Sequence, residues 1–281
     1  MRIPLYQIDA FAQRVFEGNP AAVLPLPAWL PDGLLQAIAA ENNLSETAFY
    51  VDELPAGVAA PAGPAYHLRW FTPTVEVDLC GHATLAAAGH LLDRVHPDDD
   101  EVAFWTRSGW LRVARAARPA ELVMDFPTEE LRPLPAGDST AAAAQAALGV
   151  RPDVALRGTD LVLVLADEAA VRAVAPDFPA LARLPVRGVA VAAPGGEGGV
   201  DFVSRWFGAR AGVGEDPVTG SAHSAMAPYW AARLGRRRLT ARQLSARGGT
   251  VVCEVVGDRV WLTGGYRRYL DGTVTVPGPA A

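Results

Sequence analysis

The chain has 281 residues, half of them hydrophobic and a fifth charged, which is enough for one large domain or two of ordinary size. Its formal net charge of -6 provides no basic surface for nucleic acid or for an anionic membrane, so neither partner is expected. All the basic residues are arginine. The lack of lysine excludes a Schiff-base lysine, hence ordinary pyridoxal phosphate chemistry, and a Walker-type phosphate lysine.

The two cysteines, Cys80 and Cys253, lie far apart in a chain whose start does not look like a signal peptide. We therefore expect a reduced, cytoplasmic protein without a disulfide framework. No apolar run is long enough to span a bilayer. The five histidines are scattered, without HxxxH or CxxC spacing, so neither a metal site nor a cofactor is predicted.

The first half of the chain is predicted to contain short strands around two helices. The first helix begins at Pro31-Asp32 and ends at Glu41-Asn42-Asn43. The second, over 83–92, is alanine-rich and carries almost no charge, which indicates a central, buried position. The predicted strands are 3–11, 21–24, 44–51, 66–71, 102–106, 110–115 and 121–126.

The segment 127–137 is rich in proline and polar residues and is the predicted linker. Beyond it a second set of elements follows, with helices at 140–148, 168–174 and 222–234 and strands at 160–165, 186–192, 200–207, 243–246, 250–256, 259–263 and 266–270. A long helix followed by a run of strands thus occurs once in each half. This repetition predicts a duplicated α+β protein with halves 1–126 and 127–281, in which the last strand is free to return to the first half.

Two glycine turns precede the two long predicted helices. One is Leu79-Cys80-Gly81-His82-Ala83-Thr84 and the other is Thr219-Gly220-Ser221-Ala222-His223. A helix that begins on such a turn presents unpaired N–H groups and the positive end of its dipole, which suit a carboxylate. Two such turns in one chain suggest two halves that meet over one small ligand.

Several residues near these turns have both a structural and a chemical interpretation. Glu46 stands at a strand start, where it is either an exposed charge or a carboxylate whose pKa is raised by apolar neighbours into the range of proton transfer. His82 is either a capping residue or a catalytic one, and Asp216 either caps its turn or acts as a second acid. The Cys80 thiol is either buried and inert or, beside a helix N-terminus, of lowered pKa. Ser221 lacks the flanking glycines of a nucleophile elbow, which argues against a serine hydrolase.

Five sequence blocks resemble the PhzF family, which contains the isomerase of phenazine biosynthesis. The blocks cover nearly the whole chain in the family's order: Gln7-Ile8-Asp9-Ala10-Phe11, Gly18-Asn19-Pro20-Ala21-Ala22-Val23, Asn43-Leu44-Ser45-Glu46-Thr47-Ala48-Phe49, Phe71-Thr72-Pro73 with Leu79-Cys80-Gly81-His82-Ala83-Thr84-Leu85-Ala86, and Glu215-Asp216-Pro217-Val218-Thr219-Gly220-Ser221-Ala222-His223. The resemblance implies a diaminopimelate-epimerase-like α+β fold. Each of its two halves is a curved, mostly antiparallel sheet around a central helix, and the site lies in the cleft between the halves.

The resemblance also implies a mechanism. Glu46 would move a proton between carbon atoms of a cyclic, amino acid-like substrate without a cofactor, while His82 and Asp216 hold the substrate. N–H groups at Gly81 and at Gly220-Ser221 would bind the substrate carboxylate, and Ser45 is a further expected substrate-binding residue. A homodimer is expected from the same resemblance.

Two alternatives remain open at this stage. Racemases of the wider superfamily use one cysteine from each half, and here only Cys80 stands in a glycine turn, so a two-cysteine racemase is disfavoured but a one-base epimerase through Glu46 is not. The second alternative is a non-catalytic protein that binds a carboxylated metabolite, because a fold does not establish a function. The substrate is not identified by the sequence, although 52–65 and the turn at 195–199 are predicted to contribute to specificity.

Overall fold

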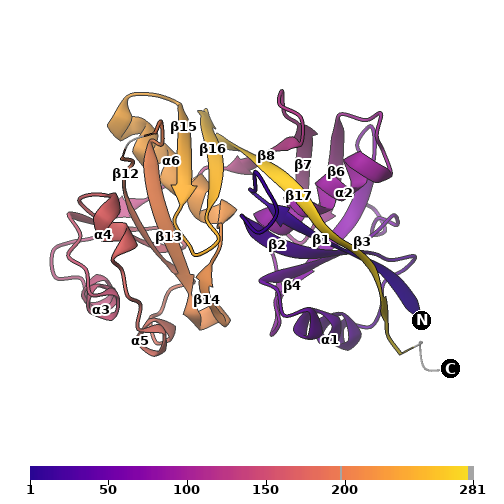
Figure 1. Cartoon of the computed structure of the whole chain (residues 1–281), viewed down its shortest axis with the longest axis horizontal. Coiled ribbons are helices and arrows are strands. Elements are labelled where there is room, and N and C mark those ends of the chain that lie inside the picture. The colour runs from indigo at the N-terminus through magenta and orange to yellow at the C-terminus, as the bar shows by residue number, and fades with distance from the viewer. Residues whose placement is uncertain (197, 278–281) are drawn as a thin grey trace. The chain divides into compact units, whose positions relative to one another are not determined.

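The computed structural model describes residues 1–196 and 198–277, which form two compact units (Figure 1). Unit 1 comprises Met1–Asp125 and Thr263–Ala281, and unit 2 comprises Phe126–Leu262. Our prediction assigned 127–281 to the second half and allowed the last strand to return. In the structure this strand belongs to unit 1, because it pairs with the first strand of the chain. Within the described residues, none of the helices is both long and apolar enough to cross a membrane.

Unit 1 is built from a mixed sheet, two helices and the returning end of the chain. Its elements are β1 (Arg2–Ala10), β2 (Asn19–Pro25), α1 (Asp32–Asn42), β3 (Glu46–Val51), β4 (Ala65–Phe71), β5 (Glu76–Val77), α2 (Gly81–Arg94), β6 (Glu101–Thr106), β7 (Gly109–Arg115), β8 (Glu121–Pro127) and β17 (Arg259–Thr275). Most neighbouring strands are antiparallel, but β2 with β3 and β4 with β6 are parallel. The parallel register sets Ala21 opposite Glu46.

Helix α2 is the core of unit 1, and every residue from Gly81 to Leu92 is buried. It contacts β1, β2, β3, β6 and β7 (Figure 1). Small side chains make this possible, because alanine and glycine allow strands to approach the helix backbone on several sides. At Gly89 a Cβ atom would lie 2.6 Å from the Tyr266 ring of β17, so the close approach of this strand requires glycine.

Unit 2 contains further strands in a mixed arrangement and all four remaining helices of the described residues. Its elements are β9 (Arg132–Pro133), α3 (Ser139–Leu148), β10 (Val154–Arg157), β11 (Leu161–Val164), α4 (Glu168–Arg172), α5 (Phe178–Ala182), β12 (Val189–Pro194), β13 (Phe202–Gly208), a 3-10 turn (Ala209–Ala211), β14 (Val213–Asp216), α6 (Gly220–Leu234), β15 (Arg238–Gln243) and β16 (Gly249–Val256). The parallel pairs here are β11 with β12 and β13 with β15. Asp138, Asp167 and Asp177 start α3, α4 and α5 by accepting a backbone N–H with their side chains.

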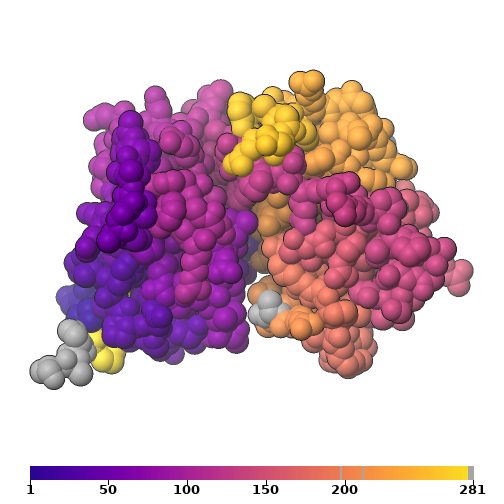
Figure 2. Space-filling model, turned by 180° about the vertical axis from the view of Figure 1, so that it is seen from behind, coloured from indigo at the N-terminus to yellow at the C-terminus, as the bar shows by residue number. Residues whose placement is uncertain are grey.

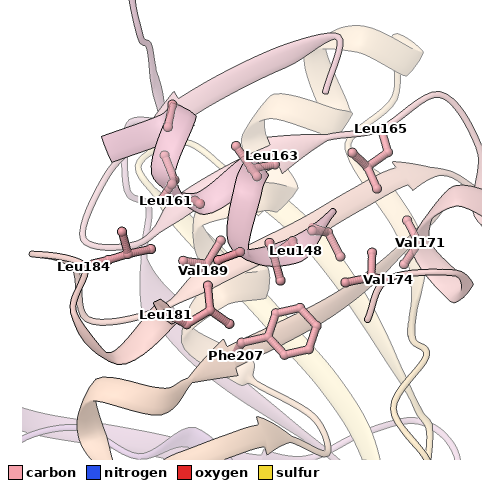
Figure 3. Close-up of a cluster of buried hydrophobic side chains, with 14 of the residues drawn as sticks. Leu148, Leu161, Leu163, Leu165, Val171, Val174, Leu181, Leu184, Val189 and Phe207 are labelled. Atoms are coloured by element: carbon pink, nitrogen blue, oxygen red, sulfur yellow. The ribbon is translucent and has the colours of Figure 1, made fainter. Parts of the chain in front are cut away.

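A hydrophobic core holds α3, α4 and α5 against the strands of unit 2. Leu148, Leu163, Leu181 and Phe207 point into this core from two helices and two strands, as Figure 3 shows. Helix α6 contacts β15 and β16 and is buried along most of its length, including Trp230. Its ring stacks on Phe202 of β13, with 5.5 Å between the ring centroids. The C-terminal part of α6 is thereby packed against the sheet.

The structure corrects our prediction at the end of the chain. We predicted two separate strands, at 259–263 and 266–270, but β17 is continuous through Gly264 and Gly265, which lie between them. A Cβ on Gly264 would clash with the Phe11 ring, and one on Gly265 would lie 2.5 Å from the Ala12 carbonyl oxygen. The glycines therefore serve close packing within a strand rather than a turn.

Other strand predictions were displaced or missed. The strand expected at 243–246 lies earlier, at Arg238–Gln243, because the alternating residues Leu239, Ala241 and Gln243 face the interior. We did not predict the short elements β5, β10, α5 and β14. We expected residues 52–65 to contribute to specificity; of these, 52–64 lie at the surface (Figure 2) and Ala65 begins β4. The other expected specificity segment, 195–199, includes residue 197, which lies outside the described residues.

Candidate active site

Glu46 is the first residue of β3 and stands beside the start of α2. Its side chain is 16% exposed, and its Oε2 atom lies 3.3 Å from Nε2 of His82, which is buried. The parallel pairing of β3 with β2 fixes the backbone of Glu46, since Ala21 is its partner in the register. The structure thus brings together two of the three predicted catalytic residues within unit 1.

His82 occupies the first turn of α2 and is held at its other ring nitrogen. Asn19, the first residue of β2, places its amide nitrogen 3.2 Å from His82 Nδ1. Burial lowers the pKa of His82 from 6.5 to about 3, so the imidazole is neutral at physiological pH. Its contact with Glu46 is therefore between a dipole and a charge rather than a salt bridge. If Nδ1 accepts from Asn19, the proton on Nε2 faces the carboxylate.

Cys80 joins this group from the residue that precedes α2. It has an extended backbone, is 6% exposed, and places Sγ 3.5 Å from His82 Nδ1. Its carbonyl oxygen accepts a hydrogen bond from the Thr84 hydroxyl at 2.5 Å. Gly81 is the first residue of the helix and is buried. The backbone N–H groups of the first turn lie beyond the reach of the helix's own carbonyls and are suited to an anion.

Ser45 immediately precedes Glu46 and is half-buried. The bend that contains it leads from the end of α1 into β3. Asn43 ends the helix in a left-handed conformation, with φ of 49°, which turns the chain toward this bend. Local chain geometry therefore places Ser45 at the entry to β3, immediately before Glu46.

In unit 2, Asp216 and Thr219 form a closed turn before α6. Asp216 is 6% exposed, and its Oδ2 atom accepts a hydrogen bond from the Thr219 hydroxyl at 2.5 Å. Gly220 and Ser221 are the first two residues of the helix, the glycine buried and the serine half-buried. The three site residues predicted in this half, Asp216, Gly220 and Ser221, thus belong to one turn.

Gln243 braces this turn, and our sequence analysis did not single it out. Its amide oxygen accepts from the Thr219 N–H at 2.9 Å, and its amide nitrogen donates to the Asp216 carbonyl at 2.6 Å. His223 adds a contact of 2.8 Å between its Nδ1 and the Thr219 carbonyl. The sequence did contain a signal for Gln243, since it is a polar residue at the third inward-facing position of a strand whose two earlier inward-facing residues are apolar.

Asn19 is the corresponding omission in unit 1. The sequence analysis included Asn19 only as part of a family block and gave it no role, whereas the asparagine is completely buried and contacts His82. Gly18 adopts φ of 67°, and a Cβ there would clash with the Ala10 carbonyl. The tight turn that glycine permits is what directs Asn19 inward.

Cys253 takes no part in either turn. It lies in β16, is completely buried, and burial raises the pKa of its thiol far above the ordinary value. A thiol in this state does not exchange protons with a substrate at neutral pH. The structure therefore gives no support to a two-cysteine racemase.

Comparison with known proteins places the chain in a family. A family model described as phenazine biosynthesis-like protein, PhzC-PhzF, matches residues 8–265. An uncharacterized isomerase of Pseudomonas aeruginosa is 50% identical over 274 residues, which are 98% of this chain and 99% of the relative. The crystal structure of a PhzF-family phenazine biosynthesis protein from Enterococcus faecalis is 43% identical, with a TM-score of 0.88 over 98% of this chain and 100% of that one.

A more distant structural likeness concerns the fold alone. A hydroxyproline epimerase from Agrobacterium vitis is 13% identical, with a TM-score of 0.61 over 99% of this chain and 94% of that one. The two-domain, epimerase-like fold that the resemblance implied is therefore confirmed at this level. The chain belongs to the phenazine biosynthesis-like PhzF family, and it is an isomerase.

Proposed function

We propose that this isomerase moves a proton between carbon atoms of a small carboxylated, amino acid-like or cyclic metabolite, with Glu46 as the acid and base. The observation that carries the proposal is the 3.3 Å contact between Glu46 and the buried, neutral His82 at the start of α2. An imidazole with so low a pKa is a weak base and a poor proton acceptor at pH 7. Glu46 is then the group of this pair that can accept a proton and return it.

The proposed reaction needs no change in oxidation state. The Glu46 carboxylate takes a proton from one carbon, and the electron pair of the broken C–H bond moves into the adjacent unsaturated system. The same carboxylic acid then delivers the proton to a second carbon, which restores the carboxylate. His82, 3.3 Å from the carboxylate, is proposed to orient it, while Asn19 contacts the other ring nitrogen.

We further propose that the substrate carboxylate binds at the N-terminal turns of the long helices. Gly81 begins α2 and Gly220 with Ser221 begins α6, and neither helix has a side-chain cap. Uncapped N–H groups and the helix dipole favour a negative charge. Asp216 and Ser45 are proposed to contact other polar groups of the substrate, and the active enzyme is proposed to be a cytoplasmic homodimer.

A screen for hydrogen exchange tests this function. The purified enzyme is incubated in heavy water with a panel of carboxylated metabolites that includes unsaturated cyclic amino acids, and products are analysed by mass spectrometry. We expect deuterium to enter one compound with the wild-type chain and not with Glu46→Gln. Normal exchange by Glu46→Gln would remove Glu46 from the reaction.

A one-base epimerase is the second candidate, because a single carboxylate and a single cysteine lie at the α2 turn. The two reactions differ in their products. An epimerase returns the proton to the same carbon with inverted configuration, whereas the proposed isomerase returns it to a different carbon. Chiral chromatography and the position of deuterium in the product distinguish them. The non-catalytic alternative is set aside, since the chain is an isomerase.

A further inference from the structure

Three side chains with different ligand atoms meet at the start of α2. Glu46 offers a carboxylate oxygen, His82 an imidazole nitrogen and Cys80 a sulfur, and these atoms all lie within 4.8 Å of one another. The His82 and Glu46 side chains are only 5% and 16% exposed, and Cys80 is 6% exposed. No other group of three such residues occurs within 1–196 and 198–277. The scattered spacing of these residues concealed the cluster in the sequence.

The combination of sulfur, nitrogen and oxygen indicates which ions would fit. Thiolate, imidazole and carboxylate ligands suit Zn²⁺ and chemically similar ions, whereas Mg²⁺ and Ca²⁺ prefer oxygen atoms alone. Ligand atoms around tetrahedral zinc stand about 3.3–3.8 Å apart, as follows from bond lengths of about 2.0–2.3 Å. The Glu46–His82 separation of 3.3 Å already has this value. Rotation of the short Cys80 side chain about its Cα–Cβ bond adjusts the sulfur.

The environment of His82 resembles the outer contacts of metal-binding histidines. Such a histidine usually donates its second N–H to a carbonyl or carboxylate oxygen. The Asn19 amide lies 3.2 Å from His82 Nδ1, and its oxygen and nitrogen exchange places by a half-turn of the amide. In that orientation Asn19 accepts from Nδ1–H, and the Nε2 lone pair faces Glu46. Among the described residues, no acceptor forms a hydrogen bond of normal geometry with Nε2. The contact of Nε2 with Glu46 is therefore loosely aligned.

We propose that Glu46, Cys80 and His82 bind a divalent cation of the zinc class, and that the bound ion inhibits the isomerase. The inhibition rests on the proposed function, because the ion occupies the carboxylate that transfers the proton. The binding itself does not depend on that function. Three protein ligands leave a fourth position for water or for a substrate carboxylate.

Cobalt provides a direct spectroscopic test of the cluster. The full-length chain is freed of metal with a chelator and titrated with Co²⁺ while the near-ultraviolet thiolate-to-cobalt absorption is recorded. We expect one Co²⁺ per chain with this absorption, displacement by equimolar Zn²⁺, and no displacement by a large excess of Mg²⁺. Absence of the thiolate band with the wild-type chain would overturn the proposal.

Variants assign the band to these residues. We expect Cys80→Ser to abolish it and His82→Gln to weaken binding at least tenfold, while Cys253→Ala, which removes the other thiol, leaves it unchanged. Thermal melting in the absence of metal identifies any variant that fails to fold. Glu46→Gln, a nearly isosteric change, then provides a second test, and we expect it also to weaken binding. Retention of the band in folded Cys80→Ser, or its loss in folded Cys253→Ala, would contradict the assignment.

The exchange assay separates this inference from the proposed function. We expect the metal-free enzyme to be active and equimolar Zn²⁺ to inhibit it. An active enzyme that binds no Co²⁺ leaves the function intact and overturns the site. An enzyme that is active only with Zn²⁺ confirms the site but overturns both the inhibition and the proton transfer by Glu46 alone.

Discussion

Helices α2 and α6 begin alike but are supported differently. Each follows an extended residue, Cys80 or Thr219, begins with glycine, and lacks a side-chain cap. At α6 the side chains of Asp216, Thr219 and Gln243 hydrogen-bond to one another and to the backbone of the turn. At α2 the His82 imidazole lies 3.3 Å from the Glu46 carboxylate and 3.5 Å from the Cys80 thiol. The comparison indicates that the α6 turn is held rigid by its hydrogen bonds, whereas the α2 turn carries groups able to exchange protons.

Removal of the acid/base group should have the largest effect. Glu46→Gln keeps the size of the side chain but cannot accept a proton from carbon. We expect the rate of exchange to fall by roughly a hundred- to ten-thousandfold. Substrate affinity, measured by calorimetry, should change little because the N–H groups of the α2 turn remain. A large loss of affinity with an unchanged maximal rate would assign Glu46 to binding instead.

The α6 turn should be sensitive to acid through His223. Burial, opposed by the hydrogen bond to Thr219, lowers the pKa of His223 from 6.5 to about 4. The unfolded chain therefore binds this proton more readily than the folded one, and the stability contribution is complete above pH 6.5 and is lost as the pH falls toward 4. The loss amounts to about 3 kcal/mol.

Urea unfolding at several pH values measures this effect. We expect the stability of the wild-type chain to fall over this interval more steeply than that of His223→Gln, which has no titrating group at this position. Equal slopes for the two proteins would show that the fold does not suppress protonation of His223.

Removal of the Gln243 side chain should lower the free energy of unfolding by a similar or smaller amount than protonation of His223. Gln243→Ala deprives the Thr219 N–H and the Asp216 carbonyl of buried partners, which is expected to destabilise the protein by about 1–3 kcal/mol. Gln145→Ala, in the half-buried middle of α3, is the matched control and should have little effect. Equal unfolding midpoints for the two variants would refute the interpretation that the hydrogen bonds of Gln243 hold the α6 turn rigid.

The smallest effect is expected at Asn19. Asn19→Ala frees the imidazole of His82 to rotate, and loss of one hydrogen bond of about 1 kcal/mol should slow exchange about five- to tenfold. Gln36→Ala, which removes a hydrogen bond from the side-chain amide to the Thr72 carbonyl, is the control and should preserve the rate. The expected change lies in the maximal rate; a change confined to KM would mean that Asn19 contacts the substrate.

Local patterns in the sequence predicted much of the fold. The uncharged run after Gly81 predicted a buried helix, and α2 is buried over its first twelve residues, Gly81 to Leu92. The continuity of β17 was not predictable in this way, because a glycine pair has the same local signature in a turn and at a close contact with Phe11. Short elements such as β14, which has only four residues and pairs with the preceding strand β13, are too short to show a local pattern of their own.

The sequence predicted the residues proposed to carry the chemistry of the site better than the residues that position them. Glu46 and His82 were selected from sequence motifs, and the structure places them in contact. Asn19 and Gln243 were not selected, since a buried amide and an exposed one look the same in a sequence. Their roles depend on contacts with residues 63 and 24 positions away.

Hydrogen exchange by two variants tests most directly whether the α2 turn transfers the proton while the α6 turn binds the substrate. Wild type, Glu46→Gln and Asp216→Asn are compared in heavy water at saturating concentrations of the compound that the wild-type enzyme labels. We predict that Asp216→Asn still exchanges when saturated, with a higher KM, whereas Glu46→Gln does not exchange. Exchange that survives in Glu46→Gln and disappears in Asp216→Asn would assign proton transfer to the α6 turn and contradict this account.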